Sequence, residues 1–233
     1  MPTITFSDAS LRIGQRTILE QFSLSLSEHR IGIIGANGSG KSTMAHMING
    51  LISPSSGTVC VDNLNVETQG KEVRNRVGFI FSDADNQIIM PTVEEDVAFS
   101  LRRRKLSRAQ RNEKVHHALN TMGLADRKEQ SPHQLSGGEK QLLALASITV
   151  LEPELIIADE PTTLLDLRNR KKVARMLHSL PQQMIIVTHD LNLLTDVDRV
   201  ICLDEGRIVD DSADPRLPSP SPRAVIDAYV ERM

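Results

Sequence analysis

The sequence contains few aromatic residues, few cysteines and no long hydrophobic run. Phe, Trp and Tyr together make up 3% of the 233 residues, and Trp is absent. The two cysteines, Cys60 and Cys202, do not form a metal-binding spacing, and two are too few for a disulfide-stapled secreted domain. The longest mostly apolar run, 142–151, contains Ser147 and Thr149 and is far shorter than the roughly 20 residues that span a bilayer. These absences exclude a disulfide scaffold and a membrane-spanning helix.

The chain also lacks an excess of charge of one sign. It has 27 Lys plus Arg and 30 Asp plus Glu, a formal net charge of −3, and so lacks the strongly basic character that general nucleic-acid binders need. Hydrophobic residues make up 39% of the chain, which is ordinary for a globular domain. The first eight residues have neither the basic start nor the apolar segment of a signal peptide. We therefore expect a cytoplasmic globular protein that does not bind nucleic acid.

Apolar periodicity predicts an α/β fold. Two alternating runs, around 4–6 and 22–26, flank a turn near Gly14 and predict a small antiparallel sheet. The later strands alternate with helices, which is typical of a mainly parallel sheet covered on both faces. We predict these strands at 31–34, 58–61, 77–81, 155–158, 184–187 and 200–203, and helical patterns at 42–51, 93–122, 136–151, 168–180 and 224–232.

A glycine-rich segment between a predicted strand and a predicted helix fits the pattern G-x-x-x-x-G-K-[ST]. The pattern and its context predict a phosphate-binding P-loop, whereas the spacing does not fit a dinucleotide-binding G-x-G-x-x-G turn. Lys41 is expected to reach the β- and γ-phosphates, and the Ser42 hydroxyl to bind Mg²⁺. A glycine-rich turn without chemistry would not need this lysine and serine together. The segment consists of Gly35, Ala36, Asn37, Gly38, Ser39, Gly40, Lys41, Ser42 and Thr43.

Two acidic residues follow the apolar run 155–158. Taken alone, Asp159 and Glu160 read as solvated carboxylates at the end of a strand. An upstream P-loop favours a functional reading, because the strand would bring Asp159 to the same sheet edge. Asp159 is then expected to hold the Mg²⁺ shell, and Glu160 to polarise an attacking water.

A second glycine pair opens the helix predicted at 136–151. Ser136 and Glu139 have the spacing of a capping box, which does not explain the adjacent glycines in a first turn that they destabilise. The glycines would expose a helix N-terminus to an anion. Because the P-loop already supplies one phosphate site, this second cradle suggests a nucleotide held by a partner copy. The motif consists of Leu135, Ser136, Gly137, Gly138 and Glu139.

These motifs, in this order, resemble the nucleotide-binding subunit of an ABC transporter, and the resemblance covers about residues 3–210. Residues 35–43 match the Walker A loop, 155–159 the Walker B strand and 135–139 the signature motif. Glu160 matches the catalytic glutamate, Asp166 the D-loop, and His189 the switch histidine that faces the γ-phosphate. The resemblance implies a head-to-tail dimer that holds two ATP molecules with Mg²⁺, each between one P-loop and the other subunit's signature.

The resemblance also implies the architecture. It predicts a P-loop NTPase (RecA-like) core with a small antiparallel β-subdomain and an inserted helical subdomain. The expected boundaries are 1–79 and 151–212 for the core, 80–150 for the helical subdomain, and 213–233 for a linker and C-terminal helix. The strand at 184–187 is expected to lie next to the Walker B strand.

The segments Asp85–Gln87 and 91–98 are similar to the ATPases of energy-coupling factor importers, and 28–35 is closest to their biotin branch, followed by the cobalt and nickel branch. This resemblance implies ATP-driven import of a vitamin or transition-metal ion from the cytoplasmic face of the membrane. The implied partners are a second ATPase subunit, identical or paralogous, a transmembrane scaffold and a substrate-binding membrane protein. Another ABC importer or an exporter is the alternative. DNA-repair ATPases would carry long coiled coils, and translation-type proteins two cassettes; neither is present.

Two positions depart from the family pattern. Ser82 stands where the family has a glutamine that contacts Mg²⁺ and water, and Gln87 lies five residues later. We expect a water to bridge from Ser82, and Gln87 to pack against the membrane partner with 91–97. Ile13 stands where the family often stacks an aromatic ring on adenine, so apolar contact is expected there. The basic run 102–105 is expected to be a solvated helical face, with anionic lipid as its alternative ligand.

Overall fold

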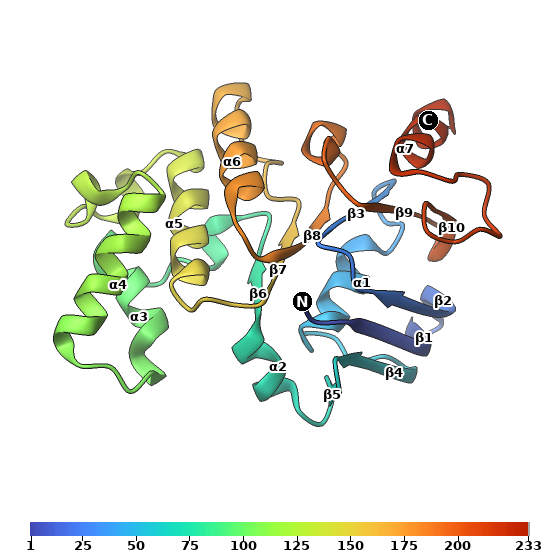
Figure 1. Ribbon diagram of the computed structural model, residues 1–233, viewed down its shortest axis with the longest axis horizontal. Helices are drawn as coiled ribbons and strands as arrows, with labels where there is room; N and C mark the ends of the chain where they lie inside the picture. The colour runs from blue at the N-terminus through green and yellow to red at the C-terminus, as the bar shows by residue number, and fades with distance from the viewer. Residues whose placement is uncertain (233) are drawn as a thin grey trace. The chain divides into compact units, whose positions relative to one another are not determined.

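The computed structural model describes residues 1–232 (Figure 1), and the chain divides into two compact units. The first unit comprises Met1–Val77, Glu154–Asp159 and the chain from Gln182 onward. The second comprises Gly78–Pro153 and Glu160–Pro181. Residues 160–181, expected in the core, thus belong to the second unit.

The first unit contains a four-stranded antiparallel sheet in the order β2-β1-β4-β5. Ile4 of β1 lies opposite Leu26 of β2 and Val61 of β4, so apolar side chains on alternate residues share one buried face. This confirms the predicted antiparallel sheet and adds two strands to its first pair, β5 and the strand predicted at 58–61, which belongs here and not to the mainly parallel sheet. The strands are β1 (Ile4–Ile13), β2 (Arg16–Leu26), β4 (Ser56–Val61) and β5 (Leu64–Asn65).

A second sheet in the same unit is mainly parallel. Its strands in this unit run in the order β10-β9-β3-β8-β7, and only β10 is antiparallel to its neighbour. β7 and β8 are buried at every residue, as near-continuous apolar strands in parallel sheets are. These strands are β3 (Arg30–Gly35), β7 (Leu155–Asp159), β8 (Gln183–Val187), β9 (Arg199–Asp204) and β10 (Arg207–Asp211).

Helix α1 (Lys41–Ile48) contacts strands of both sheets of the first unit, namely β4 and β3, β7 and β8. Its residues Met44, Met47 and Ile48 are completely buried. The residue that begins the helix therefore has a fixed position relative to the ends of β3 and β7. The unit also contains α2 (Gly70–Arg76) and α7 (Pro222–Arg232), and α7 packs on β9 and β10.

The second unit is helical beyond the short strand β6 (Val77–Ile80), through which the chain enters it. Its helices α3, α4 and α5 contact one another, and α6 packs on α5 (Figure 1). Leu142, Leu143 and Leu145 of α5 are completely buried. The helices are α3 (Val93–Ser100), α4 (Arg108–Thr121), α5 (Gly137–Thr149) and α6 (Leu167–Ser179).

The helical pattern predicted over 93–122 is interrupted. Ser107 forms a capping box with Gln110, in which each side chain bonds the other residue's backbone amide, and so begins a new helix. The run 102–105 therefore lies in the connection between α3 and α4, where Leu101–Arg103 form a short 3-10 helix. The run is exposed, as expected for a solvated face, but it is not part of one long helix. Its first residue, Arg102, stacks over the Phe99 ring at 3.8 Å.

Three elements have no counterpart among the predictions: α2, β5 and β10. β5 has two residues and α2 has seven mostly polar ones, so neither displays a readable period. β10 ends in two acids, Asp210 and Asp211, that read as loop residues but are 0% and 2% exposed. The Arg199 guanidinium donates to both oxygens of Asp211, at 2.8 and 2.6 Å, and Ser219 donates to Asp210 at 2.6 Å. Ser219 also anchors the segment predicted as a linker.

The chain leaves the first unit after Val77 and returns to it at Glu154. The backbone amide of Glu154 donates to the carbonyl of Arg76 at 2.9 Å. The Arg76 guanidinium bonds both Glu154 oxygens at 2.7 Å and Asp62 at 2.6 Å, and these hydrogen bonds raise its pKa. The segment by which the chain leaves the first unit is thus hydrogen-bonded to the segment by which it returns. No helix among residues 1–232 is long and apolar enough to cross a membrane.

Candidate functional site

The glycine-rich segment lies between the end of β3 and the start of α1, as predicted. Lys41 is the first residue of α1 and is 5% exposed. Its Nζ donates to the carbonyl oxygens of Gly35 at 2.8 Å and Ala36 at 2.9 Å. The ammonium group is therefore folded back over the loop, at the end of the helix that carries unpaired amides. A cation and a helix N-terminus together suit a phosphate group.

Close packing fixes the backbone of this loop. Gly40 has a φ of +103°, and a Cβ there would lie 2.7 Å from the Leu19 side chain, so only glycine fits without a shift. On another side, the amide of Gly206 donates to the carbonyl of Ser39 at 3.0 Å, and the amide of Glu20 to that of Gly206 at 2.9 Å. The turn between β9 and β10 thus ties the loop to β2. Gly206 was not predicted from the sequence, where a single glycine in a hairpin turn is its only signal.

Ser42 and Asp159 lie side by side, as their predicted roles require. The Ser42 Oγ donates to Asp159 Oδ1 at 2.9 Å. The carboxylate comes from the last residue of β7 and is 6% exposed. A hydroxyl and a carboxylate are the hard oxygen ligands that Mg²⁺ takes, with water and phosphate oxygens completing the shell. Residues 1–232 contain no group of three or more His, Cys, Asp or Glu that could hold a metal ion.

His46 also faces Asp159 and was not predicted from the sequence. Its Nε2 lies 3.7 Å from Asp159 Oδ2. Burial lowers the pKa of His46 and the Asp159 carboxylate only partly opposes this shift. The sequence spacing could have indicated this position, because His46 follows Ser42 by four residues and therefore lies on the same face of α1.

His189 follows the neighbouring strand. β8 pairs in parallel with β7, with Val187 opposite Asp159 (Figure 1), which confirms the predicted strand order. The Thr188 amide continues the pairing to the Ile33 carbonyl at 3.1 Å. His189 is exposed and emerges at the sheet edge where Asp159 ends β7. In the same unit, Ile13 ends β1 with 63% of its surface exposed, so it is accessible to a ligand.

Glu160 is the first residue of the second unit after Asp159. Its φ of +49° is uncommon for a residue other than glycine, and such backbone is often found at functional sites. The Thr163 hydroxyl donates to Glu160 Oε2 at 3.1 Å. The carboxylate is thereby oriented by the turn that follows β7.

The signature turn, Ser136–Glu139, begins α5 with the predicted capping box. The Ser136 amide and hydroxyl donate to Glu139 Oε2 at 2.9 and 2.7 Å, and Arg127 lies 2.9 Å from Glu139 Oε1. These contacts, chiefly the bond from the Ser136 amide, lower the pKa of Glu139. A Cβ at Gly137 would meet no atom closer than 3.4 Å. Gly137 is thus not demanded by packing among the described residues, and its contact with a ligand stays a prediction.

Packing gives Gly138 an explanation of its own, beside the predicted contact with a nucleotide, which stays a prediction. A Cβ there would lie 2.5 Å from the Asn169 side chain, so contact between α5 and α6 requires this glycine. Asn169 in turn is held by Asp166, which caps α6: Asp166 accepts from the Asn169 amide at 2.9 Å and from its side chain at 2.8 Å. Asn169 therefore joins the D-loop residue to the signature turn.

Gln87 does not face outward. Its Oε1 accepts from the Phe81 amide at 2.9 Å, and its Nε2 donates to the Phe79 carbonyl at 3.0 Å. Both ends of the amide are thus bonded to the end of β6 and its extension, and packing of the half-buried Gln87 against a membrane partner stays a prediction. Ser82 is exposed just after β6, and its water-bridging role stays a prediction.

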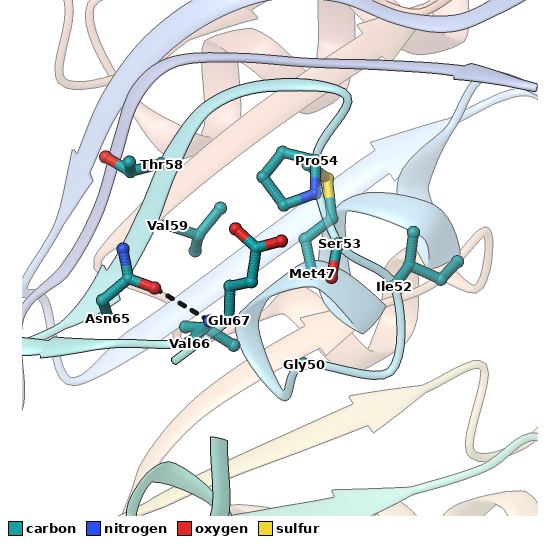
Figure 2. Close-up of a pocket in the computed structure, with 10 residues that line it drawn as sticks. All are labelled: Met47, Gly50, Ile52, Ser53, Pro54, Thr58, Val59, Asn65, Val66 and Glu67. Atoms are coloured by element: carbon teal, nitrogen blue, oxygen red, sulfur yellow. Dashed lines mark hydrogen bonds between the residues drawn. The ribbon is translucent and has the colours of Figure 1, made fainter. Parts of the chain in front are cut away.

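A small cavity in the first unit is not the candidate site. It lies beside the end of α1, and Figure 2 shows Glu67 and Asn65 on one side and Met47 and Pro54 on the other. Its volume is about 10 Å³, room for about one water. The Asn65 side chain accepts from the Glu67 amide at 2.9 Å and shapes its wall.

Comparison with known proteins identifies the family. A model of the family described as ABC transporter matches residues 19–163. The chain is 44% identical over 230 residues to a putative ABC transporter ATP-binding protein of Deinococcus radiodurans, covering 99% of this chain and 98% of the relative. It is 43% identical over 208 residues to the biotin transport ATP-binding protein BioM of Rhizobium etli, covering 89% and 92%.

The solved structures agree. The chain is similar to cbiO1 of Clostridium perfringens, described as part of the ABC transporter complex cbiONQ, with a TM-score of 0.83 and 28% identity. The likeness covers 98% of this chain and 92% of that one. The predicted ABC-type P-loop fold is therefore confirmed. With the phosphate loop, the Ser42–Asp159 pair and these relatives, the chain belongs to the ABC transporter family and is an ATP-binding subunit with ATPase activity.

Proposed function

We propose that this chain is the ATPase subunit of an energy-coupling factor importer, and that ATP closes a dimer of such subunits to drive the import of a vitamin or a transition-metal ion. The proposal rests on one observation: the groups that could bind ATP form two separate sets. Lys41, Ser42 and Asp159 are assembled around one loop, whereas the signature turn presents a separate exposed helix N-terminus. A nucleotide that lies between the loop of one subunit and the signature turn of another subunit would contact both sets of groups.

Each candidate residue has a defined task in this mechanism. Lys41 neutralises the β- and γ-phosphates, and Ser42 and Asp159 would hold Mg²⁺, which would supply further positive charge there. Glu160 accepts a proton from the attacking water. His189 contacts the γ-phosphate, and the partner copy's signature turn, through Ser136 and Gly137, closes the site against bulk water.

The assignment to the energy-coupling factor importers rests on resemblance to relatives. The relative from Rhizobium etli is named for biotin transport, and the structure from Clostridium perfringens is described as part of a transporter complex. The Asp85–Gln87 and 91–98 segments are similar to ATPases of the same group. We infer a peripheral position on the cytoplasmic face of the membrane, in contact with a scaffold and a substrate-binding protein.

Affinity purification from the native membrane tests the proposal. We expect the chain to bring with it a transmembrane scaffold and a small substrate-binding membrane protein, and the complex to bind biotin, cobalt or nickel. Purification with a two-domain exporter alone would contradict the importer assignment while leaving the ATPase assignment intact.

The composite site makes a separate prediction for the chain alone. Specific ATPase activity should rise with protein concentration, because each site needs a second copy, and turnover should approach a plateau when dimers dominate. Steady-state hydrolysis across a dilution series checks this. A specific activity that stays constant down to nanomolar protein would contradict a site shared between copies.

The exposed Ile13 predicts a gain in affinity. Replacing it with tyrosine should lower the Kd for ATP by about fivefold or more, because stacking a base on an aromatic ring contributes ~1–3 kcal/mol. Titration of the chain with a fluorescent ATP analogue measures the effect. Ile89→Tyr is the matched control, since Ile89 is 62% exposed in the second unit and is expected to leave the Kd unchanged. An unaltered Kd in Ile13→Tyr would place the adenine elsewhere.

A further inference from the structure

The connection between α3 and α4, with the start of α4, concentrates positive charge in one short stretch of the second unit. Six of the chain's 27 Lys and Arg residues lie within 102–111, which contains no Asp or Glu. The rest of the chain is acidic, because it has 30 Asp and Glu residues and only 21 Lys and Arg, 27 less these six. An anionic surface therefore attracts this stretch and repels much of the remaining protein. The six cations, which we call the basic bend, are Arg102, Arg103, Arg104, Lys105, Arg108 and Arg111.

The backbone of the basic bend is ordered. Leu101, at its start, is 1% exposed, and the Arg104 amide donates to the Leu101 carbonyl at 3.0 Å and closes the 3-10 turn. The Arg104 guanidinium donates to the Leu151 carbonyl at 3.4 Å. The capping box of Ser107 then begins α4. The cations are thus presented from a defined surface and not from a loose tail.

Most of these cations have no acidic partner. Over the described residues 1–232, no ion pair or side-chain hydrogen bond involves Arg103, Lys105 or Arg108, and all three are exposed. Lys114, further along α4, does pair with Glu152. The charge of the basic bend is therefore available to a ligand outside the chain.

The position of the arginines in α4 is not explained by helix stability. Arg108 is the first residue of α4 and Arg111 the fourth, and the first turn has no acidic residue. Negative charge stabilises a helix N-terminus, whereas positive charge there is unfavourable. A merely solvated surface gains nothing from this arrangement. An external anionic surface offsets its cost.

Apolar side chains border the basic bend. Arg102 stacks over the Phe99 ring at 3.8 Å, and Ile89 is 62% exposed. Ile89, Phe99, Arg102 and Arg103 all line one cavity of the second unit. Cationic groups beside accessible apolar groups match a bilayer interface, where charged headgroups cover an apolar layer. A nucleic acid would need a broader basic surface than this acidic chain offers.

We propose that the basic bend binds anionic lipid headgroups of the membrane that surrounds the transporter. Clustered Lys and Arg residues next to a bilayer are attracted to its anionic lipids, and the acidic remainder of the chain favours contact through this stretch alone. This inference rests on the proposed function, which places the chain at the cytoplasmic face of a membrane. It adds a direct contact with lipid to the contacts with membrane proteins.

Sedimentation of the purified chain with lipid vesicles tests the proposal. The chain should bind vesicles of phosphatidylglycerol and phosphatidylcholine in equal parts, but not vesicles of phosphatidylcholine alone. Salt at about 1 M, where the Debye length is ~3 Å, should release the bound chain. In Arg103→Gln/Lys105→Gln/Arg108→Gln the association constant should fall by about tenfold or more, because each cation near an anionic surface contributes about fivefold.

Two further variants separate charge at this place from other effects. Lys71→Gln/Lys171→Gln/Arg175→Gln removes the same charge from exposed positions on α2 and α6 and should bind the mixed vesicles as wild type does. Arg103→Lys/Arg108→Lys keeps the charge of the basic bend and should also bind as wild type. Both variants and the triple glutamine variant should hydrolyse ATP at the wild-type rate, as folded chains with an intact nucleotide site do.

Equal binding of the wild-type chain to both kinds of vesicle would overturn the lipid contact and leave the proposed function standing. An unchanged association constant in the triple glutamine variant, or an equal loss in the variant on α2 and α6, would do the same. So would tighter binding of the wild-type chain to a DNA oligonucleotide than to the mixed vesicles. Failure of the proposed function would show in the affinity purification instead, as a chain that brings no membrane protein with it, and would reject this inference as well.

Discussion

Replacing Lys41 with alanine should reduce ATP turnover by about two orders of magnitude or more, the usual loss when a preorganised charge or donor at a reacting phosphate is removed. The lysine is nearly buried and its ammonium is already positioned over the loop by Gly35 and Ala36. Little reorganisation is therefore needed when the phosphates arrive. The alanine variant loses this cation and the two hydrogen bonds that hold the loop. Both losses should appear as weaker ATP binding and slower hydrolysis.

Steady-state hydrolysis and ATP titration of the same preparation measure this prediction. Lys71→Ala is a suitable control, because Lys71 is an exposed lysine on α2 in the same unit, and it should behave as wild type. Wild-type turnover in Lys41→Ala, with the control unchanged, would show that the glycine-rich segment is not the phosphate site.

The second large effect is expected in Glu160→Gln. The variant should bind ATP normally but hydrolyse it about 10²- to 10⁴-fold more slowly, which is the usual contribution of a general base. An amide has nearly the shape of the carboxylate but cannot accept the proton from water. With hydrolysis blocked, the ATP-loaded dimer should accumulate and elute as a dimer in size-exclusion chromatography with ATP and Mg²⁺.

Glu129→Gln provides the control for this experiment, because the Glu129 side chain is 85% exposed in the same unit. It should hydrolyse ATP at the wild-type rate and show no extra dimer. If Glu160→Gln hydrolyses ATP normally and elutes as a monomer, the base is another residue, and the strained backbone at Glu160 serves the turn after β7 alone.

The two sheets and the long helices were predictable because their signals are local. The buried strands β7 and β8 each contain an uninterrupted apolar run. The capping-box spacing of Ser136 and Glu139 predicts the start of α5. The interruption between α3 and α4 was not predicted, because the Ser107–Gln110 capping box lies inside a stretch that is polar throughout. The strand β10 was also missed, since its buried acids are satisfied by side chains outside the strand, such as those of Arg199 and Ser219.

Only part of the candidate site could likewise be predicted from the sequence. The motif residues were found from spacing, and the bond between Ser42 and Asp159, which are 117 positions apart, follows from the parallel sheet. The bonding of Gln87 to β6 was not foreseen, because a glutamine in a loop carries no sign of the backbone groups it meets. The contact of Gly138 with Asn169 likewise depends on how α5 and α6 pack, which no pattern in either segment states.

The hydrogen bonds between Arg76 and Glu154 bear on how chains of this kind can exchange segments during evolution. A segment whose two ends are bonded side by side can be lengthened, shortened or exchanged while its host keeps the same two attachment points, and insertions are tolerated best at places of this kind. Residues 78–153 are therefore inserted at one fastened point, and residues 160–181, whose helix α6 packs on α5, complete the same unit. A chimaera that carries both stretches together from a relative should retain a folded host as long as Arg76, Asp62 and Glu154 are kept.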